Sequence, residues 1–135
     1  MSVEYAAEIP PMTPERWLAN LFEVSREIAD QEKQESRWIA SDRYPWENPG
    51  ELFCSLFDDC VFELFIEKYA DTFSAEQSKA IVSFRESMNR WNESTAPGFA
   101  DPVKALQDPD WANAQISARA FESAFEGKWP ATPVG

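Results

Sequence analysis

The sequence predicts an all-α protein, a single-domain helical bundle of four main helices plus a short fifth. Apolar residues recur at helical spacing in each long segment, and each such segment follows a residue suited to cap a helix. No segment alternates apolar and polar residues over the length of a strand. With 135 residues, the chain has the length of one domain, residues 1–135, which can bury about two thirds of its unfolded surface.

The first helix is predicted to begin after Thr13, which can cap it, with Pro14 in its first turn. Residues 1–12 contain two consecutive prolines and are expected to form an irregular lead-in. The helix is expected to end between Glu32 and Ala40, in a charged run that suits either a helix or a solvated loop. Its inward face consists of Trp17, Leu18, Leu21, Phe22, Val24, Ile28 and Ala29.

One central helix is predicted over Asn48–Phe73, ending near Thr72, after a connection over residues 41–47. Asn48 can cap it and Pro49 suits its first turn. The helix is apolar around most of its circumference, so other elements are expected to surround it. Its main stripe consists of Leu52, Phe53, Leu56, Phe57, Cys60, Val61, Leu64 and Phe65.

Ser74 and Gln77 form a capping-box pattern, which predicts the start of the next helix. This helix is expected to extend to about Asn92 and to be followed by a loop over residues 93–100, where turn-forming residues gather. Its apolar stripe consists of Ala80, Ile81, Phe84, Met88 and Trp91.

Two acid–proline pairs, Asp101-Pro102 and Asp108-Pro109, predict the starts of a short helix and of a longer last helix. Gly127 is predicted to stop the last helix, because glycine is favoured just past a helix C-terminus. Trp129 is expected to pack back on the core, and residues 130–135 are expected to form a loose tail.

Acidic residues dominate the charge of the chain, with 24 Asp and Glu against 12 Lys and Arg and a net charge of −12. This balance argues against nucleic acid or an anionic membrane as a direct partner. It favours either a basic partner or a soluble acidic surface, and the charge alone does not choose between them.

Several features favour a cytoplasmic protein. The N-terminal residues lack the basic flank and apolar core of a signal peptide, and no apolar run approaches the roughly 18 residues of a membrane span. Cys54 and Cys60 lie on different sides of the predicted central helix, whereas bridged α-carbons must lie within about 7 Å. Both are therefore predicted to be reduced, buried and structural, as in a cytosolic compartment.

The residue types argue against catalysis. The chain has no histidine, which removes the commonest general base and metal ligand. Carboxylates at i, i+4 and i+8 (Asp59, Glu63 and Glu67) share one helix face, but carboxylate di-metal sites in bundles normally add Glu-x-x-His motifs. We expect no enzyme activity, no catalytic or metal site and no cofactor.

Two interpretations of this acidic face remain open. It is either a solvated surface, compensated in part by Lys68 and nearby Arg, or a binding face for a partner. Tyr44 and Trp46 in the connection likewise either fold over the core or belong to a partner-facing patch. The candidate partner-binding residues are Tyr44, Trp46, Asp58, Asp59, Glu63, Glu67 and Asp71.

A loose family resemblance favours the binding interpretation. The run Leu56-Phe57-Asp58-Asp59, followed by Glu63 and Phe65, is similar to a helix of small, acidic, all-α immunity proteins. These belong to bacterial contact-dependent inhibition and other polymorphic toxin systems. The segment Asp108–Phe125 also resembles C-terminal helices in several such families. The resemblance spans about half of the chain and assigns no single immunity family.

The resemblance implies a cytosolic protein that binds a cognate toxin, often a basic nuclease, and blocks its active site. The alternative hypothesis is a helical adaptor or regulatory protein that binds another protein, with no toxin involved. An adjacent gene for a basic toxin would separate the two. The sequence leaves the identity and activity of the toxin and the oligomeric state undetermined.

Overall fold

The computed structural model describes residues 13–39, 48–95 and 102–130, and all regular structure within these ranges is helical. The all-α prediction is therefore confirmed for this part of the chain. The lead-in over residues 1–12 lies outside it, as does the tail beyond residue 130. The elements are α2 (Pro14–Ala29), α3 (Gln31–Gln34), the π-helical turn η1 (Glu35–Ile39), α4 (Pro49–Cys54), the π-helical turn η2 (Ser55–Asp59), α5 (Phe62–Tyr69), the 3₁₀ turn η3 (Ala70–Thr72), α6 (Ala75–Thr95), α7 (Pro102–Gln107) and α8 (Pro109–Phe125).

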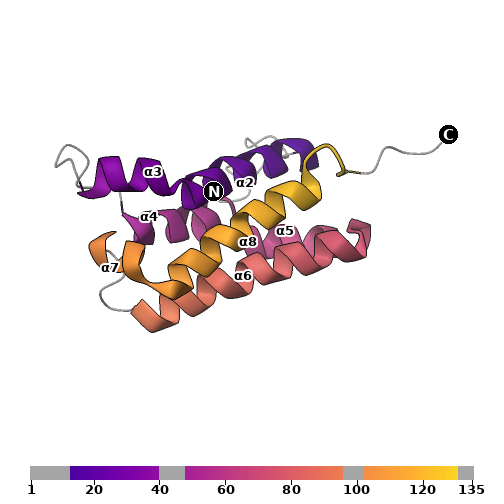
Figure 1. Ribbon diagram of the computed structural model, residues 1–135. Coiled ribbons are helices and arrows are strands. Elements are labelled where there is room, and N and C mark those ends of the chain that lie inside the picture. The colour runs from indigo at the N-terminus through magenta and orange to yellow at the C-terminus, as the bar shows by residue number, and fades with distance from the viewer. Residues whose placement is uncertain (1–12, 40–47, 96–101, 131–135) are drawn as a thin grey trace, which may run out of the picture.

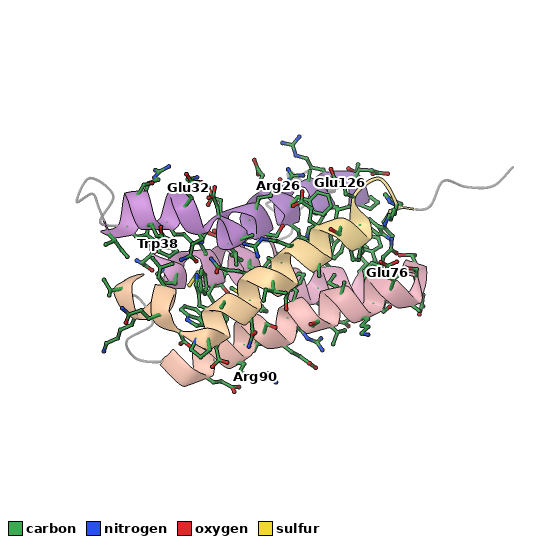
Figure 2. All side chains as sticks on the ribbon, in the orientation of Figure 1. Arg26, Glu32, Trp38, Glu76, Arg90 and Glu126 are labelled. Carbon is green, nitrogen blue, oxygen red and sulfur yellow. The ribbon has the colours of Figure 1, made fainter. Side chains whose placement is uncertain are left out.

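Helix α8 lies at the front of the molecule between α2 and α6, with α4 and α5 behind it (Figure 1). The helices share one aromatic-rich core, and Figure 2 shows labelled charged side chains such as Glu32 and Arg90 on its outer surface. The largest fully buried side chains are Trp91, Trp111, Phe62, Phe65, Phe84, Phe121, Phe125, Leu21, Ile28, Leu56, Ile81 and Met88.

The predicted helix starts are confirmed wherever a capping side chain is described. The Thr13 hydroxyl accepts a hydrogen bond from the Arg16 amide at 3.1 Å, and the Asp108 carboxylate caps α8 through the Asp110 amide at 2.8 Å. Such caps satisfy amide groups that have no partner within the helix.

The capping box at the start of α6 also holds the end of α8. The Ser74 amide donates to Gln77 Oε1 at 2.9 Å, and the Gln77 amide donates to Ser74 Oγ at 3.1 Å. The side-chain amide of Gln77 then donates to the carbonyl oxygens of Ala124 and Lys128, at 3.2 and 3.3 Å. One buried side chain therefore satisfies polar groups at two helix ends.

The end of α8 follows the prediction. Gly127 adopts a left-handed conformation with φ of 69° just past the helix, where glycine carries no Cβ penalty. Trp129 is buried, packs against Phe65 and Phe125, and donates its indole N–H to Thr72 Oγ1 at 2.9 Å.

The first helix ends earlier than predicted. It stops at Ala29, because Asp30 leaves the helical conformation (φ −88°, ψ 80°) and its carboxylate caps the next turn through the Lys33 amide. Helical turns then continue to Ile39. The charged run is therefore helical, but it forms a separate segment.

Side chains from other elements satisfy the carbonyl groups at the end of α2. The buried amide of Gln34 donates to Glu27 O and Ile28 O, both at 2.8 Å. Its oxygen accepts from Trp111 Nε1 at 3.1 Å and from Gln115 Nε2 at 3.0 Å, both on α8. The carbonyl groups of Glu27 and Ile28 at the end of α2 therefore have hydrogen-bond partners, although the helix breaks at Asp30.

The prediction of one continuous central helix is wrong. The chain forms α4 and η2, leaves the helix at Cys60, and passes through Val61 in a left-handed conformation (φ 50°, ψ 54°) before α5 begins. Beyond this break, Phe62 and Phe65 are both fully buried. The count of four helices plus one is wrong for the same reason, since both of the first two predicted helices are interrupted.

The C-terminal half matches the prediction more closely. Helix α6 extends to Thr95, three positions beyond the predicted end at Asn92. Helices α7 and α8 begin at the predicted prolines.

Candidate functional site

The predicted acidic residues lie on both sides of the break between η2 and α5. Asp58 and Asp59 end η2, Glu63 and Glu67 lie on α5, and Asp71 lies in η3. All five side chains are exposed. We call these five residues the acidic flank.

The acidic flank is not the continuous helical stripe that the spacing predicted. The break at Val61 separates Asp59 from Glu63, so the expected i, i+4, i+8 register holds only for Glu63 and Glu67. A carboxylate oxygen of Glu63 lies 3.6 Å from a guanidinium nitrogen of Arg85 on α6. The predicted compensation by a nearby arginine therefore occurs at Glu63.

The break places two large apolar side chains at the surface. Val61 is 42% exposed and Leu64 is 48% exposed, although both were predicted to belong to the buried stripe of the central helix. They border a cavity of about 170 Å³ beside α2. We call it the break cavity; its lining residues are Trp17, Asn20, Asp59, Cys60, Val61 and Leu64.

Two hydrogen bonds between α2 and Cys60 join residues that line the break cavity. The indole N–H of Trp17 donates to the carbonyl oxygen of Cys60 at 2.6 Å. The Cys60 thiol lies 3.8 Å from the carbonyl oxygen of Asn20. Trp17 also contacts the rings of Phe65 and Tyr69 edge-on. These contacts hold Trp17, the aromatic residue in the lining of the cavity, in place.

The exposure of Val61 and Leu64 was not predicted, although the sequence of the central segment contains a signal for it. The central segment carries apolar residues at more positions than one helical stripe can bury, including Phe62 and Ile66 beside the main stripe. A straight helix must expose some of them unless partners surround it.

The two predicted aromatic contact residues, Tyr44 and Trp46, lie outside the described residues.

Both cysteines are free thiols, as predicted, and Cys60 is buried. The prediction that Cys54 is buried is wrong, because its side chain is exposed on α4. Desolvation, followed by the charge of Asp58, raises the pKa of Cys54. Burial, followed by the charges of Asp59 and Glu23, raises the pKa of Cys60. Raised thiol pKa values are the opposite of what a nucleophilic cysteine needs.

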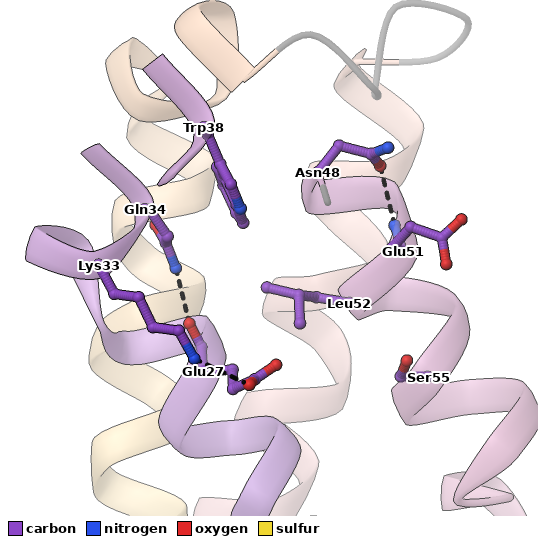
Figure 3. A pocket seen from close by; sticks show the side chains of 8 residues that line it. All are labelled: Glu27, Lys33, Gln34, Trp38, Asn48, Glu51, Leu52 and Ser55. Atoms are coloured by element: carbon purple, nitrogen blue, oxygen red, sulfur yellow. Dashed lines mark hydrogen bonds and ion pairs between the residues drawn. The ribbon is translucent and has the colours of Figure 1, made fainter. Parts of the chain in front are cut away.

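A second, more polar pocket of about 180 Å³ lies between the α2–α3 turn and α4 (Figure 3). The Lys33 ammonium contacts a carboxylate oxygen of Glu27 at 3.1 Å, and Gln34 caps the end of α2. The side-chain oxygen Oδ1 of Asn48 accepts from the Glu51 amide at 3.0 Å and caps the start of α4. These contacts give the named side chains structural roles. The lining residues are Glu27, Lys33, Gln34, Trp38, Asn48, Glu51, Leu52 and Ser55.

Within the described ranges, no group of three or more Cys, Asp or Glu side chains is arranged to hold a metal ion. In the same ranges, no helix has both the length and the apolar character to cross a membrane. Comparison of the chain with protein-family models, curated proteins and solved structures gives no match.

Proposed function

We propose that this protein is a cytoplasmic immunity protein that binds a cognate protein toxin with a basic surface, such as a nuclease, and neutralises it. The observation that carries the proposal is the exposed acidic flank beside the exposed apolar residues Val61 and Leu64. A polar rim around a more apolar core is the general anatomy of a protein–protein interface. The similarity of the Leu56–Asp59 run to immunity proteins supports the same role.

Electrostatics favours a basic partner. The net charge of −12 creates a long-range field that attracts cations. Clustered carboxylates raise the rate at which a basic protein finds its docking site, and they disfavour acidic competitors. Exposed charges of this kind act mainly on the association rate. The proposal therefore predicts binding kinetics that depend on salt.

The experiment measures binding of the protein encoded by the adjacent gene. This probe is produced together with the wild-type chain, purified under denaturing conditions and refolded. Surface plasmon resonance then gives the rates at two salt concentrations. Association should slow as salt rises, because the Debye length is about 8 Å at physiological ionic strength and shorter above it.

A matched pair of triple variants distinguishes the effect of the charges on the acidic flank from the effect of the net charge of the whole chain. Asp59→Asn with Glu63→Gln and Glu67→Gln removes three charges from the acidic flank. At low salt this variant should slow association by about an order of magnitude. The control changes three exposed acids elsewhere, labelled in Figure 2, to Gln: Glu32, Glu76 and Glu126.

The control variant has the same net charge as the acidic-flank variant, so equal slowing in both would reject the acidic flank as the binding face. Absence of any binding by the wild-type chain would reject the proposed function.

A further inference from the structure

We infer that the break cavity receives one apolar side chain of the partner, which lies next to Lys or Arg on the partner's surface. This inference rests on the proposed function and names the part of the interface that would anchor it. It also assigns a role to Val61 and Leu64, which neither the charge nor the resemblance explains.

The size of the break cavity fits a single large apolar side chain. Its volume is about 170 Å³, and an engineered apolar cavity of about 150 Å³ binds benzene. A leucine or phenylalanine side chain is therefore of suitable size. The half-exposed Leu64 and the ring of Trp17 supply apolar walls, and interface anchors typically fill pockets of this kind.

One carboxylate lines the cavity and two others lie on the helices beside it. Asp59 belongs to its lining. Glu67 lies one helical turn beyond Leu64, and Glu23 lies one turn beyond Asn20. An apolar side chain flanked by Lys or Arg would complement this arrangement.

The nearby cations are partly engaged within the chain. Arg85 pairs with Glu63 at 3.6 Å, and the Lys68 ammonium lies 5.7 Å from the ring centre of Tyr69. Arg16 lies one turn before Asn20. Arg85 and Lys68 therefore have contacts of their own within the chain, and Arg16 is an exposed cation beside the cavity.

A second copy of this chain is a poor occupant. Self-association through the break cavity would bring two acidic flanks together, and opposed like charges at an interface disfavour association. The charge pattern therefore favours a basic partner over a homodimer.

The experiment uses the adjacent-gene protein described above as the probe, with two variants at the cavity. Leu64→Ala removes an apolar wall, and Asn20→Phe fills the cavity from α2. Each should weaken binding by at least about 30-fold, as expected for a buried anchor. The control is Ile116→Ala, which truncates an equally large apolar side chain that is 60% exposed on α8. Its affinity should stay within about threefold of the wild type, as for most surface contacts.

The possible outcomes separate this inference from the proposed function. If both cavity variants bind like the wild type while the acidic-flank variant associates slowly, the cavity is not the anchor and the proposed function stands. Weakening by only one cavity variant, or by Ile116→Ala as strongly, also overturns the inference. If the wild-type chain does not bind the probe, the proposed function fails and the inference fails with it. Thermal melts of each variant confirm that the folded protein is compared.

Discussion

The indole N–H of Trp17 donates a hydrogen bond to the carbonyl oxygen of Cys60 at 2.6 Å, although the two residues lie 43 positions apart in the sequence. In an uninterrupted helix, that carbonyl would accept from the amide of Leu64. The Trp17 contact instead provides a partner for it at the break. Helix α2 therefore stabilises the interruption that exposes Val61 and Leu64.

Trp17→Phe should destabilise the protein by about 1–3 kcal/mol, because it leaves the buried Cys60 carbonyl without its donor. Trp129→Phe is the matched control, since Trp129 is equally buried but donates to the exposed hydroxyl of Thr72. That hydroxyl can hydrogen-bond to water instead, so Trp129→Phe should lower the free energy of unfolding by less than Trp17→Phe. Urea unfolding of both variants measures the difference, and an equal or larger loss for Trp129→Phe would contradict it.

Val61→Gly should raise stability by about 1 kcal/mol, because a β-branched residue is strained in the left-handed conformation and glycine is not. Val61→Ala removes nearly the same contacts but keeps the Cβ atom, so it should bring no comparable gain. The free energies of unfolding of the two variants test this. If Val61→Gly is no more stable than Val61→Ala, the backbone strain at the break is negligible.

Gln34→Met should destabilise the protein by at least about 2 kcal/mol, because it leaves the buried indole N–H of Trp111 without its partner and removes the hydrogen bonds of Gln34 to Ile28 O and Gln115. Gln31→Met is the control, since Gln31 hydrogen-bonds only to the exposed Glu35 among the contacts described for it. Its effect should stay within about 0.5 kcal/mol. Chemical denaturation compares the two, and similar losses would argue against the role of Gln34.

Both thiols should react slowly with iodoacetamide at pH 8. Raised pKa values lower the thiolate fraction at a given pH, and the thiolate is the reactive form. The pH midpoint for alkylation of the exposed Cys54 should therefore lie above that of the same residue in the urea-unfolded chain. Cys60 should react more slowly still, because it is also buried. Mass spectrometry of the labelled peptides gives both rates, and a lower midpoint in the folded protein would contradict the expectation.

Local sequence signals predicted most of the helix boundaries. Caps such as Thr13 and the Ser74–Gln77 box act within one turn, so their residue types suffice. The break at Val61 was missed because neither proline nor glycine marks it. It depends on Trp17, which reaches Cys60 only once the helices have packed.

The candidate site was predictable in part for the same reason. The exposure of acids such as Glu63 and Glu67 follows from their charge, whatever the backbone does. Their register relative to Asp59, and the exposure of Leu64, depend on the direction in which α5 leaves the break. That direction is a tertiary property.

The double role of Gln77 couples local unfolding at two helix ends. Its backbone and side chain cap the start of α6, and the same side-chain amide binds the carbonyls of Ala124 and Lys128 at the end of α8. Fraying at either helix end would release the other. Amide protons in the first turn of α6 and around Trp129 should therefore exchange with solvent as one cooperative unit.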